Sequence, residues 1–155
     1  MEQDFKETCI RLAQEEAEFA IKEGNTPIGS VLVSPSGEVV ERAHNTQNSS
    51  CDPTAHAEIN LLRKAAQKLR TRYLNGYSIF SSAEPCSMCV SAGIKAKIFE
   101  YYFGAPHEPS MDPDLSIFDL IPYAKEPITV EGEILKKSCE AQIKRGRESL
   151  ATNTK

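Results

Sequence analysis

The sequence has no tryptophan, no long apolar run and no excess of basic over acidic residues. A membrane-spanning helix needs about 20 consecutive apolar residues, so no such helix is predicted. The N-terminus also lacks the basic and apolar regions of a secretory signal, and a cytoplasmic protein is expected. Because the formal net charge is −4, a chain-wide surface for polyanions is not expected either.

The chain has five cysteines, and an odd count does not suit the disulfide framework of a small secreted domain. The rest of the composition, 40% hydrophobic and 26% charged, is ordinary for a globular protein. We therefore expect residues 1–155 to form a single domain whose last residues, 151–155, fray.

The most informative residues are one histidine and two cysteines. His56 is followed later in the chain by Cys86, which forms a C-x-x-C pair with Cys89. One nitrogen and two sulfurs suit tetrahedral zinc with a fourth position for water, the pattern of a hydrolytic rather than a structural site. Cys51 is the alternative fourth ligand. A zinc-activated water needs a base to take its proton, and Glu58, two residues after the histidine, is the candidate.

The order H-x-E and then P-C-x-x-C is the signature of zinc nucleobase deaminases. With these residues the chain resembles the cytidine deaminase-like superfamily, most densely over 52–59 and 84–89. The resemblance implies a three-layer α/β/α fold with a mixed five-stranded sheet, one zinc per chain and a homodimer. It further implies a hydrolase that replaces an amino group of a nucleobase or nucleoside with a carbonyl and releases ammonia, with Glu58 as the proton carrier.

Substrate contacts are expected on the same basis. The resemblance implies a base-binding role for the Asn45 side chain and for main-chain atoms near Ala57 and Ala83. Ile28 would stand in the wall of the base pocket, where Gly29 would allow close approach of the backbone. An ordinary turn for Asn45 and an ordinary strand entry for Gly29 are the alternatives.

The spacing of apolar residues predicts helices and strands in alternation. Thr54 should cap the helix that carries His56 and Glu58 in its first turn, where the helix dipole would favour an ionised carboxylate. A further helix should carry both C-x-x-C cysteines in its first turn, and the two strands that it connects should run parallel. The other expected helices cover 4–23, 115–123 and 134–150, and the strands cover 28–34, 38–44, 77–82, 97–103 and 128–130.

A polar, proline-rich segment, 104–113, follows the strand 97–103. It lies at the end of the strand where open α/β sheets bind ligands. His107, Asp112 and Asp114 are its candidate pocket residues, although each alone is more often a surface residue.

Different stretches of the chain resemble enzymes with different substrates. The stretches 26–29 and 133–139 resemble bacterial tRNA adenosine deaminases, but Pro106 and His107 depart from the basic residue and Asp that are usual in that branch. The stretch 52–58, with His107 further along, looks more like guanine deaminases. We therefore predict a small base or nucleoside as the substrate, purine-type such as guanine first, with a tRNA-specific adenosine deaminase as the alternative.

Two basic stretches keep the tRNA alternative open. Residues 63–72 include five basic and no acidic residues, and residues 134–155 include six basic residues against two acidic ones. Such stretches are usually solvated faces. The alternative from another class is a non-catalytic zinc-stabilised binding module, but a structural zinc site would not need Glu58.

Overall fold

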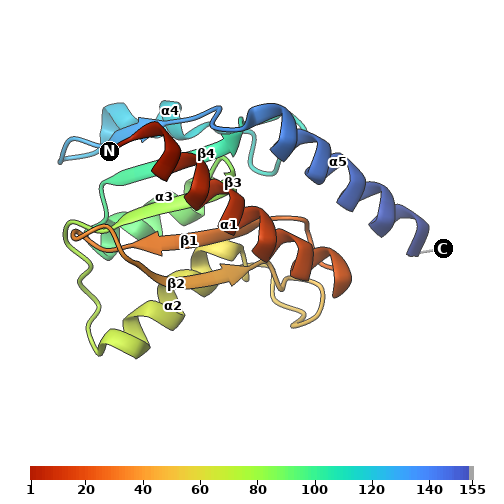
Figure 1. The fold of residues 1–155 in the computed structure, drawn as a ribbon, viewed down its shortest axis with the longest axis horizontal. Helices are drawn as coiled ribbons and strands as arrows, with labels where there is room; N and C mark the ends of the chain where they lie inside the picture. Colours follow the sequence, from red (N-terminus) through yellow and green to blue (C-terminus); the bar gives the residue numbers. More distant parts are fainter. Residues whose placement is uncertain (154–155) are drawn as a thin grey trace.

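The computed structural model describes residues 1–153, and its strands form a mixed sheet in the order β2-β1-β3-β4-β5 (Figure 1). β1 pairs antiparallel with β2 and with β3, whereas β3 pairs parallel with β4, and β4 with β5. The mixed five-stranded sheet and the parallel pair across the C-x-x-C helix confirm the prediction. The strands span Gly29–Val33 (β1), Val39–His44 (β2), Ser78–Ala83 (β3), Glu100–Ala105 (β4) and Thr129–Glu131 (β5).

Helices cover both faces of the sheet. α1 and α5 lie over one face, with α1 in front of the sheet in Figure 1, and α2 and α3 lie over the other. This is the predicted three-layer α/β/α arrangement. The helices span Gln3–Lys22 (α1), Ala57–Leu69 (α2), Ser87–Lys95 (α3), Ile117–Leu120 (α4) and Lys136–Asn153 (α5), and a 3-10 helix spans Ile121–Tyr123 (η1).

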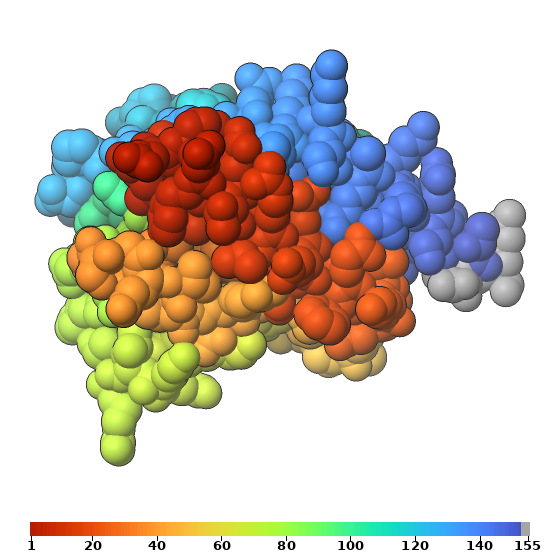
Figure 2. All heavy atoms as spheres, viewed as in Figure 1, coloured from red at the N-terminus to blue at the C-terminus, as the bar shows by residue number. Residues whose placement is uncertain are grey.

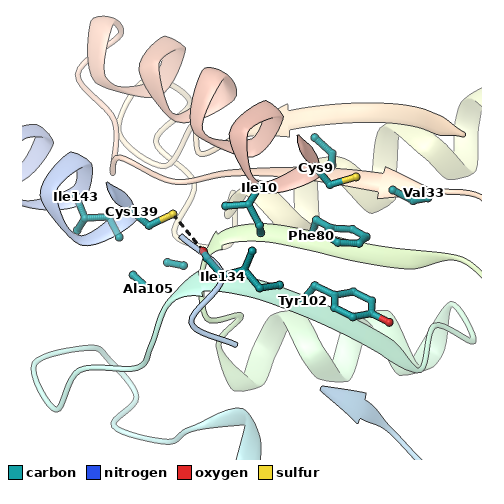
Figure 3. Packing of buried hydrophobic residues seen from close by; sticks show 11 residues of the cluster. Cys9, Ile10, Val33, Phe80, Tyr102, Ala105, Ile134, Cys139 and Ile143 are labelled. Carbon is teal, nitrogen blue, oxygen red and sulfur yellow. Dashed lines mark hydrogen bonds between the residues drawn. The ribbon is translucent and has the colours of Figure 1, made fainter. Parts of the chain in front are cut away.

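The core consists of two layers, one on each side of the sheet. β1 and β3 are buried along their whole length because helices cover both of their faces. Alternate residues of β3 serve different layers: Phe80 packs with residues of α1, and Ile79 packs with residues of α2. Figure 3 shows the layer under α1, where Phe80 stacks on Tyr102 with ring centroids 4.5 Å apart. Figure 2 shows α1 and part of α5 covering this side of the molecule.

The starts of α2 and α3 lie later than predicted. His56 is the N-cap of α2 and Cys86 is the N-cap of α3, so neither residue lies within the first helical turn. Thr54 does not cap α2 because its hydroxyl and its backbone N–H both donate to the Asp52 carboxylate, at 2.7 and 2.8 Å. This turn ends the loop after β2 and brings His56 to the helix start.

Two other boundaries differ from the prediction. β4 begins at Glu100 rather than at Lys97, because Lys97 has a left-handed backbone conformation with a φ of 67°. α5 continues to Asn153, so residues 151–153 of the predicted frayed tail are helical, while 154–155 lie outside the described residues. None of the described helices is both long and apolar enough to cross a bilayer.

Gly29 lies where α1 packs against β1. A Cβ atom at this position would lie 2.1 Å from the Ala13 carbonyl oxygen and 2.6 Å from the Ala17 amide nitrogen. The close approach that the glycine allows is therefore made by α1, and Gly29 opens β1, which fits the alternative of an ordinary strand entry.

Candidate active site

The three predicted metal ligands meet between the starts of α2 and α3. The His56 Nδ1 atom lies 3.4 Å from the Cys86 sulfur and 3.5 Å from the Cys89 sulfur, and the two sulfurs are 3.5 Å apart. The ligand atoms of the three residues all lie within 4.8 Å of one another. The loops before α2 and α3 therefore bring one nitrogen and two sulfurs into a single cluster.

The geometry of this cluster suits zinc. Tetrahedral zinc with sulfur at about 2.3 Å places two sulfur ligands about 3.8 Å apart, close to the separation of the two cysteines. Cys51 is not part of the cluster, because it is exposed and its sulfur lies 3.8 Å from the Asn48 carbonyl oxygen. Three protein ligands are the number typical of catalytic rather than structural zinc sites.

The contact between the two sulfurs shifts the pKa values of both cysteines. The contact with the Cys89 sulfur, followed by that with the His56 ring, outweighs burial and lowers the pKa of Cys86 to about 4. The same contact, together with burial, raises the pKa of Cys89. Zinc binds thiolates, so metal uptake must release the Cys89 proton.

Glu58 lies beside the cluster in the first turn of α2. The residue is 3% exposed, and its Oε2 atom accepts a hydrogen bond from the Cys89 thiol at 3.3 Å. Burial raises the pKa of the Glu58 carboxyl group, and the charge of His56 acts in the opposite direction. The helix start was expected to favour the ionised carboxylate, whereas burial acts in the opposite direction. A carboxyl group with a raised pKa can take and return a proton closer to neutral pH.

A cavity of about 200 Å³ opens onto the cluster and Glu58. Segments before β1, after β2 and after β4 supply most of its wall, and α5 adds one residue. The lining residues are Thr26, Ile28, Asn45, Gln47, His56, Ala57, Glu58, Cys86, Met111, Asp112 and Arg147. Four predicted substrate residues, Ile28, Asn45, Ala57 and Asp112, are therefore brought together with the metal ligands.

Three other predicted substrate residues do not line the cavity. His107 Nε2 and Asp114 Oδ1 lie 2.7 Å apart, so these two side chains bond to each other. Ala83 is the last residue of β3 and packs in the core layer under α1. The three residues therefore lie outside the cavity wall, and their roles, including that of main-chain atoms near Ala83, stay predictions.

Sequence reasoning missed four lining residues: Thr26, Gln47, Met111 and Arg147. Gln47 bonds directly to a residue that was predicted. Its side-chain oxygen accepts a hydrogen bond from the Asn45 side chain at 2.8 Å, and its backbone N–H donates to Asn45 Oδ1 at 2.9 Å. The signal for Gln47 was its position two residues after Asn45, in the polar loop that leads to the metal ligand.

The sequence matches the family model of the cytidine and deoxycytidylate deaminase zinc-binding region over residues 3–105. The chain belongs to this deaminase family. Zinc is the cofactor of the family, and His56, Cys86 and Cys89 form the candidate zinc site.

Individual relatives within the deaminase family divide between two substrates. The tRNA-specific adenosine deaminase of Aquifex aeolicus is 37% identical over 100 residues, which are 64% of this chain and 66% of the relative. A solved structure from studies of A-to-I editing by tRNA:A34 deaminases is 31% identical, with a TM-score of 0.78, and the match covers 87% of this chain and 98% of that one. The guanine deaminase structure from Bacillus subtilis is 33% identical, with a TM-score of 0.61 and coverage of 65% and 64%. The match with the Aquifex protein thus spans just under two thirds of that relative.

Proposed function

We propose that this chain is a zinc-dependent hydrolytic deaminase that replaces an exocyclic amino group of a nucleobase with a carbonyl group. The position of Glu58 carries the proposal. Its carboxyl oxygen lies 3.3 Å from the sulfur of Cys89, and Glu58 lines the same cavity as His56 and Cys86. A purely structural zinc site offers no reason to bury a carboxyl group there, since burial of such a group is unfavourable.

The proposed reaction needs only water as a co-reactant. Zinc, when bound, supplies the Lewis acid that makes water nucleophilic at neutral pH. The water oxygen forms the new bond to the ring carbon, the bond from that carbon to the amino nitrogen breaks, and ammonia leaves. Glu58 carries protons from the attacking water to a ring nitrogen and to the leaving amine.

Asn45 is proposed to orient the base. The residue is 2% exposed, and its carboxamide uses one donor and one acceptor position in its two hydrogen bonds with Gln47. A carboxamide has two N–H donors and an oxygen with two lone pairs, so one donor and one acceptor are left for a base edge. The Gln47 contacts also hold the Asn45 side chain in one orientation.

The size and charge of the cavity favour a small purine-type base or nucleoside. Its volume of about 200 Å³ falls below the roughly 300–1,000 Å³ of sites for larger small molecules. Asp112 lies in the wall, and Arg147, the arginine of the lining, is paired with Glu108 at 2.9 Å. A phosphate group that entered here would meet a carboxylate and a guanidinium that already has a partner.

Adenosine in tRNA is the second candidate substrate, and the Aquifex and tRNA:A34 relatives favour it. A tRNA enzyme would hold phosphates through basic residues outside the cavity. Arg63 lies 3.7 Å from Asp52, and Arg145 is paired with Glu18. Both are partly exposed ion pairs of the kind that contributes little to stability, so phosphates could replace the acidic partners.

Ammonia release tests the proposal and separates the two candidates. Zinc-loaded protein is incubated with guanine, adenine, guanosine, adenosine, cytidine and an anticodon stem-loop that carries adenosine at the wobble position. We expect ammonia from a free base or nucleoside, guanine first, and none from the stem-loop. Inosine in the stem-loop without ammonia from the small substrates would favour the second candidate. No ammonia from any substrate at full zinc occupancy would reject the deaminase and favour the zinc-stabilised binding module.

A homodimer is proposed from the family resemblance. Light scattering should give twice the chain mass of 17.1 kDa. The mass of a single chain at micromolar concentration would contradict it.

A further inference from the structure

Glu84 has a buried carboxylate that takes no part in the chemistry proposed above. The residue is 5% exposed and directly follows β3, two residues ahead of Cys86. Its Oε1 atom accepts a hydrogen bond from the His107 backbone N–H at 3.3 Å, and its Oε2 atom accepts one from the Ile117 backbone N–H at 3.1 Å. One side chain therefore joins the two ends of the segment 107–117.

This segment forms part of the cavity wall. Met111 and Asp112, near its middle, both line the cavity. The segment is braced by the contact between His107 and Asp114 at 2.7 Å and by the bond from α5 to Glu108 at 2.9 Å. It contains no strand and no helix before Ile117, so polar contacts rather than a backbone ladder hold its shape.

Burial makes the two bonds to Glu84 difficult to replace. Ile117 is fully buried, so its N–H has no access to water if the carboxylate is lost. A buried donor without a partner shifts an equilibrium by about tenfold or more. The carboxylate in turn needs both donors, because a buried charge is unfavourable without hydrogen bonds.

We infer that Glu84 is a positioning residue that sets the cavity wall formed by Met111 and Asp112 relative to the zinc cluster. Glu84 itself does not line the cavity, so it acts through the segment whose ends it joins. The short stretch from Glu84 to Cys86 thus places both a zinc ligand and the substrate wall. The effect on substrate rests on the proposed deaminase function, whereas the effect on the segment does not.

The test compares Glu84→Gln with Asp119→Asn. Both change a carboxylate to an amide, and Asp119 also accepts a backbone N–H, from Ser116 at 2.8 Å, but it is exposed and does not line the cavity. Glutamine keeps one acceptor oxygen and turns an NH₂ group toward the other donor. We expect exchange of the His107 or Ile117 amide hydrogen, followed by NMR, to become about tenfold faster in Glu84→Gln. Asp119→Asn should leave both amides unchanged, and both variants should keep their zinc.

The second measurement is the KM and kcat of Glu84→Gln, with the substrate that the ammonia-release experiment identifies. KM should rise about tenfold in Glu84→Gln, with a smaller change in kcat, because the wall binds the substrate and does not react. Glu84→Asp, which keeps two acceptor oxygens, should restore part of the affinity.

Each contrary outcome has a definite meaning. Unchanged exchange at both amides would overturn the inference whatever the activity, and so would loss of zinc from Glu84→Gln. Faster exchange with unchanged KM and kcat would overturn the positioning role. If the wild-type protein releases no ammonia, the proposed function fails by itself, and amide exchange alone decides whether Glu84 holds the segment.

Discussion

The Cys89 thiol donates a hydrogen bond to the Glu58 carboxyl group, with sulfur and oxygen 3.3 Å apart. One residue is a candidate zinc ligand on α3, and the other is the candidate proton carrier on α2. The contact needs the proton of Cys89, which zinc binding removes. Zinc uptake should therefore complete the ligand set and release the Glu58 carboxyl group in the same event.

Removal of one ligand should remove the metal. We expect about one zinc per chain in the wild-type protein and almost none in Cys86→Ala, because two ligands do not hold zinc as three do. The variant should also unfold at a lower temperature, since metal binding contributes to folding stability. Atomic absorption of the purified proteins measures the zinc. Cys51→Ala is the control, and loss of zinc from that variant would show that the ligand set is wrong.

Asn45 should matter more for turnover than the exposed basic residues of α5. Asn45→Ala leaves a base edge unpaired in the cavity, at a cost of ~1–3 kcal/mol, so kcat/KM should fall about tenfold to a hundredfold. Neutralising Lys144 and Arg145 together, both exposed and outside the cavity wall, should change it little.

The salt dependence of turnover is an independent test of whether the substrate is a small base or tRNA. Turnover of a small neutral base should change little between low and moderate salt, because no phosphate contacts release counterions. A steep loss of kcat/KM with salt, or a large effect of the Lys144 and Arg145 changes, would instead favour tRNA.

Gly29→Ala should destabilise the fold. The added methyl group would lie 2.1 Å from the Ala13 carbonyl oxygen, so α1 must move away from β1. Overpacking of this kind costs ~1–3 kcal/mol. Equilibrium unfolding in urea measures the loss, and unchanged unfolding free energy would show that α1 does not pack on β1 as closely as described.

We predict a loss of folding stability at alkaline pH from two buried thiols. They belong to Cys9 and Cys139, which Figure 3 shows in the layer under α1. Burial raises the pKa of the Cys9 thiol to about 11 and that of Cys139 to about 12, from an ordinary value of 9.0. The folded chain holds these protons more tightly than the unfolded chain. Their contribution is therefore complete below pH 9 and is lost as the pH rises through about 11 to 12.

The slope of the unfolding free energy against pH measures this linkage. Cys9→Ala should flatten the slope above pH 9 by up to about 1.4 kcal/mol per pH unit, the value for one linked proton. Comparing slopes rather than stabilities separates the lost titration from the cavity that the smaller side chain leaves. An identical slope in Cys9→Ala would contradict the raised pKa.

The zinc cluster could be predicted from sequence because residue type and order nearly determine it. His56 stands at one helix start and the C-x-x-C pair at another. The chain reaches these starts from β2 and β3, which run in the same direction on either side of β1. The individual helices and strands were accessible from their apolar periods, whereas the three-layer arrangement was what the family resemblance implied.

The cavity wall could not be predicted in the same way. Arg147 reaches the cavity from α5, and Met111 reaches it along an irregular segment whose ends meet at Glu84. Such contacts join residues far apart in the chain, so they produce no periodic pattern in the sequence. The bond between His107 and Asp114, which lie outside the cavity wall, is likewise not visible in the sequence.

The most direct test of the account is ammonia release by Glu58→Gln protein that carries as much zinc as the wild-type protein. The amide keeps the shape of the side chain but cannot take up and return a proton. We predict that the variant retains its zinc and loses ~10²-fold or more in kcat, the usual contribution of a general acid–base group. Turnover comparable to the wild type at equal zinc occupancy would contradict the role of Glu58 as the proton carrier.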